Sequence, residues 1–243
     1  MAIFQKRRLF LGGISLLLLC LVFGLTAFSK KKNNTVIELT NRYDSSHNET
    51  LDLYENLDLE KMGLSREAFL YALKGYKHLQ KTGKLFNDAV ISVIDFSLPS
   101  TQKRFFVIDL ENDKLLFHTY VSHGKNSGKL MAKNFSNKSS SYQSSLGLYT
   151  TGSTYFGKHG FSLRLIGMEK GINDQAMKRG IVIHSADYAS ETFALQQGYL
   201  GRSQGCPAIP EEVHKALIET IENRSCLFIY SPVKLYSKQS KLI

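Results

Sequence analysis

The sequence predicts a β-rich α+β domain, built as mixed sheets or a sandwich, that follows a helical segment and an apolar N-terminal helix. Three observations carry this fold class. Short β-branched and aromatic runs, separated by turn residues, dominate the chain after residue 88. Only a few stretches show helical spacing. One long apolar run stands near the N-terminus. The length of 243 residues suggests one domain with an appendage or two small ones, and a hydrophobic content of 43% is enough for a sizeable core.

The apolar run covers residues 9–28 and follows a basic start at residues 6–8. About 20 apolar residues can span a bilayer, and a basic start with an apolar centre also describes an export signal. A small-x-small cleavage site is poor here, because Leu25 stands two residues before Ala27. We therefore interpret residues 1–32 as an uncleaved membrane-spanning signal anchor or, alternatively, as a signal peptide.

The charge of the chain is concentrated in this N-terminal segment. The net charge is +10, and residues 1–32 hold six basic side chains and no acidic ones. The remainder holds 25 basic and 21 acidic side chains and has no stripe of interleaved basic and aromatic residues. A nucleic-acid partner is therefore not expected. Residues 33–50 are polar and predict a tether.

Residues 51–84 predict a helical extension that packs on the domain that follows. Residues 51–62 form a short amphipathic helix candidate. Ser65 then has the character of an N-cap, Glu67 suits the first turn of a helix, and Gly83 ends it. Apolar side chains recur at helical spacing in between: Phe69, Leu73, Tyr76 and Leu79.

Residues 85–236 predict the β-rich domain itself, and residues 237–243 are left as a tail. The expected strands cover residues 89–96, 104–110, 115–122, 146–151, 162–166, 180–184 and 227–230. Residues 111–114 join two of them in a tight hairpin, and residues 123–144 are loop-like. A helix begins at Pro210, which suits a first turn, and extends to Asn223.

Two of the three cysteines, Cys206 and Cys226, lie beyond the apolar run that holds Cys20. If the domain is exported, disulfides can persist there, so a Cys206–Cys226 disulfide is one alternative. The favoured alternative is a free Cys226, because it opens the strand-like run of residues 226–230, where a buried thiol is ordinary.

Cys206 and His184 form the most informative pair of the sequence. Gly205 leaves room beside the cysteine for a substrate carbonyl and lets backbone N–H groups approach it. A free thiol has a pKa of about 8.5, so it needs an imidazole or a positive field to react at neutral pH. Residues 181–183 predict a buried strand that would hold the His184 ring in place. The pair indicates a cysteine acyl-transfer enzyme.

The order of several motifs is more specific than this pair alone. His184 on its strand precedes Ser-x-Gly-Cys at residues 203–206. Further signatures lie at residues 121–124, 135–137, 144–149, 157–160, 171–174 and 201–203. With these motifs the chain resembles the murein L,D-transpeptidase catalytic domain family, a branch of the YkuD-type cysteine transpeptidases. The resemblance runs from about residue 51 to residue 230 and implies a YkuD-like catalytic fold.

The resemblance implies a two-step acyl transfer in peptidoglycan. Cys206 would attack the bond between the third residue and the terminal D-alanine of a tetrapeptide stem, with His184 as the base. An amine of a neighbouring stem would then take the acyl group and form a 3→3 cross-link. Gly205, Ser185 and Ser203 would serve as oxyanion or orienting groups. No cofactor or metal is implied.

The resemblance also implies the partners and the place of action. The partners would be peptidoglycan stem peptides and, through the N-terminal segment, the membrane. The protein would work in the cell envelope, either anchored in the inner membrane or exported to the periplasm. Two other functions stay open: the same site with water as acceptor would give an L,D-carboxypeptidase or peptidoglycan hydrolase, and a non-catalytic wall-binding module would need neither Cys206 nor His184.

Four more side chains are predicted to contact the substrate: Arg202, Gln204, His123 and Tyr149. The planar fork of Arg202 suits a substrate carboxylate. Gln204 stands where the wider family often has a histidine, which leaves His184 as the one strong base. His159 and Asp187 are predicted as turn residues rather than site residues.

Overall fold

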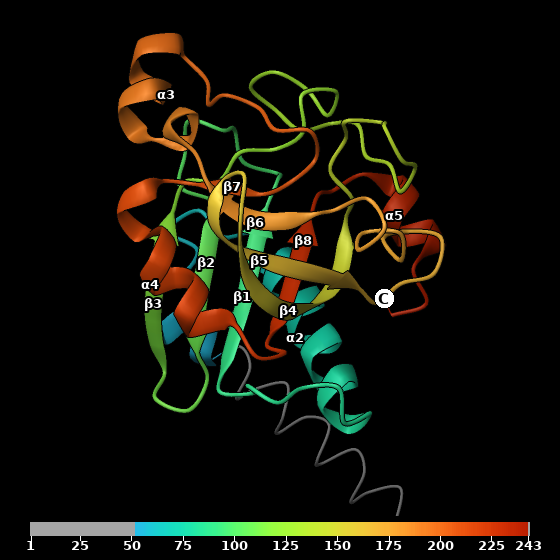
Figure 1. Cartoon of the computed structure of the whole chain (residues 1–243). Helices are drawn as coiled ribbons and strands as arrows, with labels where there is room; N and C mark the ends of the chain where they lie inside the picture. Colours follow the sequence, from blue (N-terminus) through green and yellow to red (C-terminus); the bar gives the residue numbers. More distant parts are fainter. Residues whose placement is uncertain (1–51, 243) are drawn as a thin grey trace, which may run out of the picture. The chain divides into compact units, whose positions relative to one another are not determined.

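The computed structural model describes residues 52–242 (Figure 1). Its strands are β1 (Val90–Asp95), β2 (Phe105–Asp109), β3 (Lys114–Thr119), β4 (Gly147–Gly157), β5 (Gly160–Gly167), β6 (Val182–Ser185), β7 (Ala208–Ile209) and β8 (Cys226–Tyr230). Its helices are α2 (Arg66–Lys81), α3 (Glu191–Gln197), α4 (Glu211–Ile221) and α5 (Lys234–Gln239), with a 3₁₀ turn at Asp187–Ala189. The prediction of a β-rich fold with few helices is confirmed.

The strands follow one order, β3-β2-β1-β8-β4-β5-β6-β7. Neighbours are antiparallel except for β1 with β8 and β6 with β7, which are parallel. The last strand, β8, lies between β1 and β4 and so joins the two halves of the sheet. The sequence left mixed sheets or a sandwich open, because such a pairing between distant segments leaves no local pattern.

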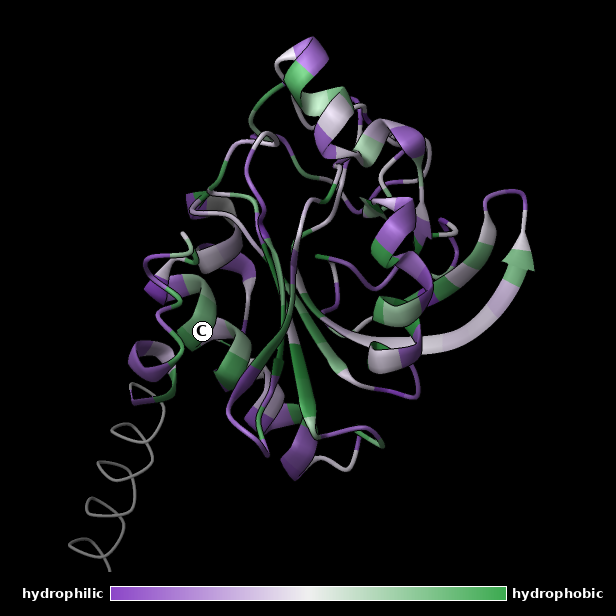
Figure 2. Cartoon of the chain, turned by 90° about the vertical axis from the view of Figure 1, so that its left-hand side faces the viewer, coloured by the Kyte–Doolittle hydropathy of each residue, from purple (hydrophilic) through white to green (hydrophobic). Residues whose placement is uncertain are grey.

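The centre of the sheet is buried on both faces. Every residue of β1 and of β8 is buried. Helix α2 packs against both strands, and α4 contacts β1, β5 and β6. Figure 2 shows hydrophobic residues along the central strands and hydrophilic residues on the outer turns. Continuous apolar strands of this kind are typical of a sheet that is covered on both sides.

Helix α2 begins where the sequence predicts. The Ser65 side chain accepts a hydrogen bond from the Ala68 N–H at 3.0 Å, so the predicted N-cap is confirmed. Gly75 brings the helix close to β4, since a Cβ there would lie 2.6 Å from a methyl carbon of Leu148. The described part of the segment before α2 differs from the prediction. From residue 52 on, the helix continues to residue 56, and turns occupy residues 57–63, where Asp58 has a φ of 51°.

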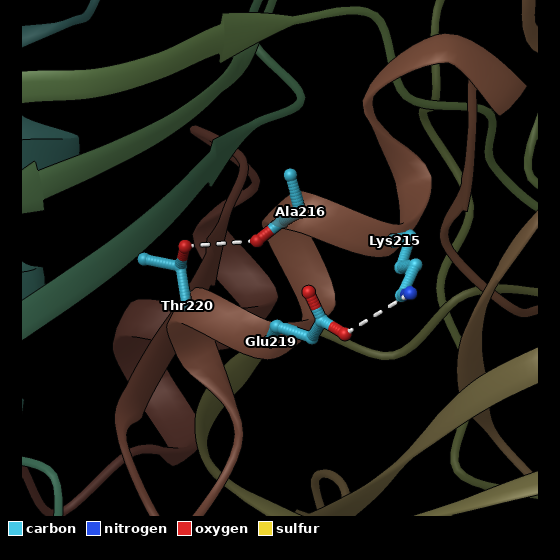
Figure 3. Close-up of polar contacts among 4 residues, drawn as sticks. All are labelled: Lys215, Ala216, Glu219 and Thr220. Carbon is cyan, nitrogen blue, oxygen red and sulfur yellow. Dashed lines mark hydrogen bonds and ion pairs between the residues drawn. The ribbon is translucent and has the colours of Figure 1, made fainter.

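Helix α4 is amphipathic, with one face in the core and one in solvent. Its buried residues are His214, Leu217, Ile218 and Ile221. On the outer face, Lys215 pairs with Glu219 at 3.8 Å and the Thr220 hydroxyl donates to the Ala216 carbonyl at 2.8 Å (Figure 3). Pro210 occupies the N-cap position rather than the first helical turn. An exposed pair of this kind adds little stability, so the buried face holds the helix in place.

The C-terminal segment does not begin a tail at residue 237, because α5 continues across that position. The buried carboxylate of Glu169 ties the segment to the sheet. It accepts hydrogen bonds from the Leu148 N–H at 2.7 Å, the Tyr236 hydroxyl at 2.9 Å and the Ser240 hydroxyl at 2.6 Å. The sequence did not predict α5, nor the short elements α3 and β7, which each have fewer than eight residues.

Strand β4 is longer than predicted and forms a hairpin with β5. It continues past residue 151 to Gly157, with a register shift between Thr151 and Thr154. Residues 152–157 were not predicted as part of a strand, because their glycine and polar residues interrupt the apolar pattern. The turn at residues 158–159 carries His159 toward the cavity described below.

The predicted N-terminal anchor and tether, residues 1–32 and 33–50, lie outside the described residues. Within residues 52–242, no helix has the length and apolar character needed to cross a membrane.

Candidate active site

The predicted catalytic pair lies in one cavity of about 600 Å³. Both Cys206 and His184 line it, and so do the predicted residues Ser203, Arg202 and Gln204. The other lining residues are Ser140, Tyr142, Tyr155, Lys158, His159, Arg179, Gly180, Ile181, Val182 and Tyr188. Four segments of the chain therefore meet here: the loop before β4, the β4–β5 hairpin, residues 179–188 around β6, and the loop before β7.

His184 is held by strand β6 and by its neighbour. His184 as a residue is 3% exposed, and its Nδ1 donates a hydrogen bond to the Ser185 carbonyl at 2.8 Å. A carbonyl can only accept, so this contact leaves Nε2 without a proton and able to take one. The orientation comes from the backbone of Ser185 and not from its side chain.

The surroundings of His184 favour its neutral form. Burial is the main cause of a lowered pKa, and the nearby His159 and His214 rings add to it. The ring of His159 stacks on that of His184, with 4.5 Å between the ring centres. His159 thus lies in the cavity, which differs from its prediction as a turn residue without a site role.

The backbone around Cys206 is fixed by Ser203. The Ser203 hydroxyl accepts from the Gly205 N–H at 3.0 Å and donates to the Cys206 carbonyl at 2.6 Å. Gly205 has a φ of 125°, a conformation that favours glycine. Because its N–H is already used, Gly205 does not offer a free donor for an oxyanion. Within residues 52–242, the Cys206 N–H has no hydrogen-bond partner, so it is the better candidate.

The Cys206 thiol is half-buried and free. Its Sγ lies 3.7 Å from the Gly180 carbonyl oxygen. Burial raises the pKa of the thiol, while a hydrogen bond with the Val182 backbone and the charge of Arg179 act in the opposite direction. The thiol therefore needs a base or a cation to react at neutral pH.

Cys226 is also a free thiol, and it is fully buried in β8. The alternative of a Cys206–Cys226 disulfide is therefore wrong for this structure. Burial raises the pKa of Cys226 strongly. A buried thiol in apolar surroundings is inert.

Two residues that the sequence assigned to the substrate lie in the interior instead. Tyr149 in β4 is fully buried and donates its hydroxyl proton to the Ser145 carbonyl at 3.1 Å. His123 is also fully buried: its Nδ1 accepts from an Arg104 Nη at 2.8 Å, and its Nε2 donates to the Gly128 carbonyl at 3.2 Å. Neither lines the cavity. Their motifs serve packing and loop order.

The structure predicts that His123 makes the fold sensitive to acid. Burial, and then the charge of Arg104, lowers the pKa of His123 from 6.5 to about 3. Below pH 6.5, His123 therefore binds a proton in the unfolded chain, whereas in the folded chain it stays neutral until the pH approaches 3. The contribution of neutral His123 to the free energy of unfolding is complete above pH 6.5. As the pH falls towards 3, the free energy of unfolding decreases by up to about 1.4 kcal/mol per pH unit.

Urea unfolding between pH 7 and pH 4 checks this expectation. His123→Gln keeps one acceptor and one donor but cannot titrate in this range. We expect its free energy of unfolding to fall less steeply with pH than that of the wild type. Parallel curves for the two proteins would contradict the assignment.

The two remaining predicted substrate residues, Arg202 and Gln204, are exposed at the cavity. Arg202 stands above the Tyr199 ring, 5.6 Å from its centre, and its Nη1 lies 3.4 Å from the Gly128 carbonyl oxygen. No carboxylate pairs with it within residues 52–242. Asp187 accepts from the Tyr188 N–H at 2.7 Å, as expected of a turn residue.

Sequence reasoning missed Arg179 and Lys158, which both line the cavity. Arg179 immediately precedes the predicted strand of residues 180–184, which carries His184. This position was the one feature of the sequence that could have indicated a place for Arg179 near the site. Among residues 52–242, no cluster of three or more His, Cys, Asp or Glu side chains is arranged to hold a metal ion.

Comparison with known proteins gives one family. A family model described as the L,D-transpeptidase catalytic domain matches residues 60–230. This bears out the resemblance read from the motifs. No curated protein matches the sequence.

Similar solved structures include three that share little sequence with this chain. An L,D-transpeptidase from Mycobacterium smegmatis has 13% identity and a TM-score of 0.35, over 58% of this chain and 67% of that one. The LD transpeptidase LdtMt1, solved in complex with imipenem, has 17% identity and a TM-score of 0.36, over 58% and 59%. The helical cell shape determining protein Pgp2 from Campylobacter jejuni has 14% identity and a TM-score of 0.41, over 70% and 58%. The chain thus spans 58% to 67% of the length of these structures.

Proposed function

Since the chain belongs to the L,D-transpeptidase catalytic domain family, we propose that it is a cysteine-dependent L,D-transpeptidase that acts on peptidoglycan stem peptides. One observation carries the proposal. A free thiol, Cys206, and an imidazole whose Nε2 is available, His184, line the same cavity. The pairing of a nucleophile with a base that a third group orients is the arrangement needed for covalent acyl transfer.

The first step forms a thioester. Cys206 Sγ attacks the carbonyl carbon of the bond between the third stem residue and D-alanine, and the thiol proton passes to Nε2 of His184. The carbonyl oxygen becomes negative, and the Cys206 N–H, which has no hydrogen-bond partner within residues 52–242, would donate to it. The C–N bond then breaks, and His184 returns the proton to the nitrogen of the departing D-alanine.

The second step transfers the acyl group. An amine of a neighbouring stem attacks the thioester carbon and gives a proton to His184. The C–S bond breaks, the sulfur takes the proton back, and a 3→3 cross-link has formed. The acceptor must enter a cavity whose lining includes the cations Lys158, Arg179 and Arg202 and no acidic residue.

The resting pair is neutral in this account. Burial raises the pKa of the Cys206 thiol and lowers that of His184, so neither effect favours a preformed ion pair. Proton transfer therefore accompanies the attack rather than preceding it. The imidazole remains able to accept a proton below pH 6.5, which extends activity to mildly acidic conditions.

Action on peptidoglycan requires the catalytic domain to lie outside the cytoplasm. We propose that residues 9–28 anchor the protein in the membrane and that residues 33–50 tether the domain on the outer side. The apolar length and the poor cleavage site of this segment support an anchor. Protease added to spheroplasts should digest the catalytic domain. Complete protection of the domain would contradict the placement.

Muropeptide analysis tests the function. Cells that express the chain should contain 3→3 cross-linked muropeptides that disappear when the gene is deleted and return with the wild-type gene but not with Cys206→Ala. A change only in the ratio of tripeptide to tetrapeptide stems, with no cross-linked species, would show that water is the acceptor. No change in any muropeptide would overturn the proposed substrate.

A further inference from the structure

Of the side chains that line the cavity, Arg179 makes the most hydrogen bonds. Its guanidinium is half-buried and donates four hydrogen bonds, all to one loop, residues 136–145. The acceptors are the Ser136 carbonyl at 2.7 Å, the Ser145 hydroxyl at 2.5 Å, the Gln143 carbonyl at 2.6 Å and the Ser141 hydroxyl at 3.3 Å. A planar fork with fixed donors holds such a set better than an ammonium group would.

The loop that Arg179 holds lies against the backbone next to Cys206. A Cβ on Gly205 would lie 2.8 Å from the Gln143 carbonyl oxygen and 3.2 Å from Nη2 of Arg179. The Ser144 hydroxyl also donates to the Gly205 carbonyl at 3.3 Å. Only a glycine fits here, so the guanidinium and the loop that it holds lie directly against the Gly205–Cys206 segment.

The charge of Arg179 is not neutralised by a carboxylate. No Asp or Glu lines the cavity, and no acidic side chain within residues 52–242 forms an ion pair with the guanidinium. Its partners are neutral oxygens. An unpaired cation in a partly buried cavity favours a nearby anion, because water screens it less than at the surface.

We propose that Arg179 is the positioning residue for Cys206, which clamps residues 136–145 against Gly205 and stabilises the thiolate that forms during attack. The inference rests on the proposed function in taking Cys206 as the nucleophile. The favourable effect of Arg179 on the ionised thiol agrees with it, since that charge lowers the pKa that burial raises.

The pH dependence of thiol alkylation tests the charge. The full chain in detergent is treated with iodoacetamide, and mass spectrometry of the Cys206 peptide gives the rate at each pH. We expect Arg179→Gln to move the midpoint of the curve of alkylation rate against pH upward by about one pH unit. This shift lowers the fraction of Cys206 present as thiolate at neutral pH about tenfold. Lys178→Gln is the matched control, because it removes a positive charge from the adjacent, exposed residue and should leave the midpoint unchanged.

Arg179→Lys separates the clamp from the charge. Lysine keeps the cation but loses the fork, so we expect a midpoint close to that of the wild type with turnover lowered at least tenfold. A folded Arg179→Gln variant with the wild-type midpoint would overturn the role of the charge. If Arg179→Gln does not fold, Arg179→Lys decides, and wild-type turnover in that variant would overturn the clamp.

The alkylation readout needs no substrate. A wild-type protein without transpeptidase activity but with the expected shift in Arg179→Gln would therefore count against the proposed function alone.

Discussion

Cys206→Ala is expected to abolish turnover and to leave the fold intact. The thiol supplies the covalent step, and its half-buried position at the cavity contributes little to the core. Cys206→Ser should be nearly as inactive, because a hydroxyl is a far weaker nucleophile beside a neutral imidazole. The measurement is the release of D-alanine from a tetrapeptide stem, with thermal unfolding as the check on the fold.

Cys226→Ala is the matched control for this variant. It removes the other described thiol, which is fully buried in β8 and away from the cavity. We expect full turnover with a loss of about 1 kcal/mol in the free energy of unfolding, from the gap left in the core. Equal loss of turnover in both cysteine variants would contradict the assignment of Cys206 as the nucleophile.

His184→Ala is expected to lower the rate of acylation by about 10² to 10⁴-fold, the usual contribution of a positioned general base. Within residues 52–242, no other imidazole combines a place in the cavity with a tautomer fixed by a backbone carbonyl, as the Ser185 carbonyl fixes that of His184. The pH profile should change as well. Because burial lowers the pKa of His184 below its ordinary value, the wild type should keep its activity into mildly acidic conditions and lose it only at lower pH, where His184 becomes protonated. The variant should lack this limb of the profile.

Two controls make the result specific to His184. His78→Ala removes an exposed histidine of α2 and should have the wild-type rate. Gln204→Ala should have a much smaller effect than His184→Ala, since Gln204 has no group that titrates. If the loss of activity at acidic pH persists in His184→Ala, it is caused by a group other than His184. His159, which stacks on the His184 ring, would then be the first residue to substitute.

Local signals predicted much of the fold. Ser65 was predicted as an N-cap because a short polar side chain before helical spacing has one main use, and the structure confirms it. The runs that became β1, β2, β3 and β8 were visible because their residues are apolar or β-branched over several positions. The insertion of β8 between β1 and β4 was not predictable, since no local pattern encodes a pairing between residues more than 70 apart.

The site was predictable only where a motif carries its chemistry. Cys206, His184 and Ser203 share the cavity because their motif places them on β6 and on the loop before β7. His123 and Tyr149 belong to equally visible motifs, yet both are buried, since a motif does not reveal whether it faces a cavity or the core. Arg179 was missed because its partners lie 34 to 43 residues away in the chain.

Intact-protein mass spectrometry of the full chain with a tetrapeptide stem tests the central claim most directly. We predict an adduct whose mass equals the stem without D-alanine, located on Cys206 by peptide mapping, with an equal amount of D-alanine released. Addition of a second stem with a free amine should remove the adduct and produce a 3→3 cross-linked dimer. Formation of the dimer without an adduct on Cys206, or by the Cys206→Ala variant, would contradict the cysteine mechanism.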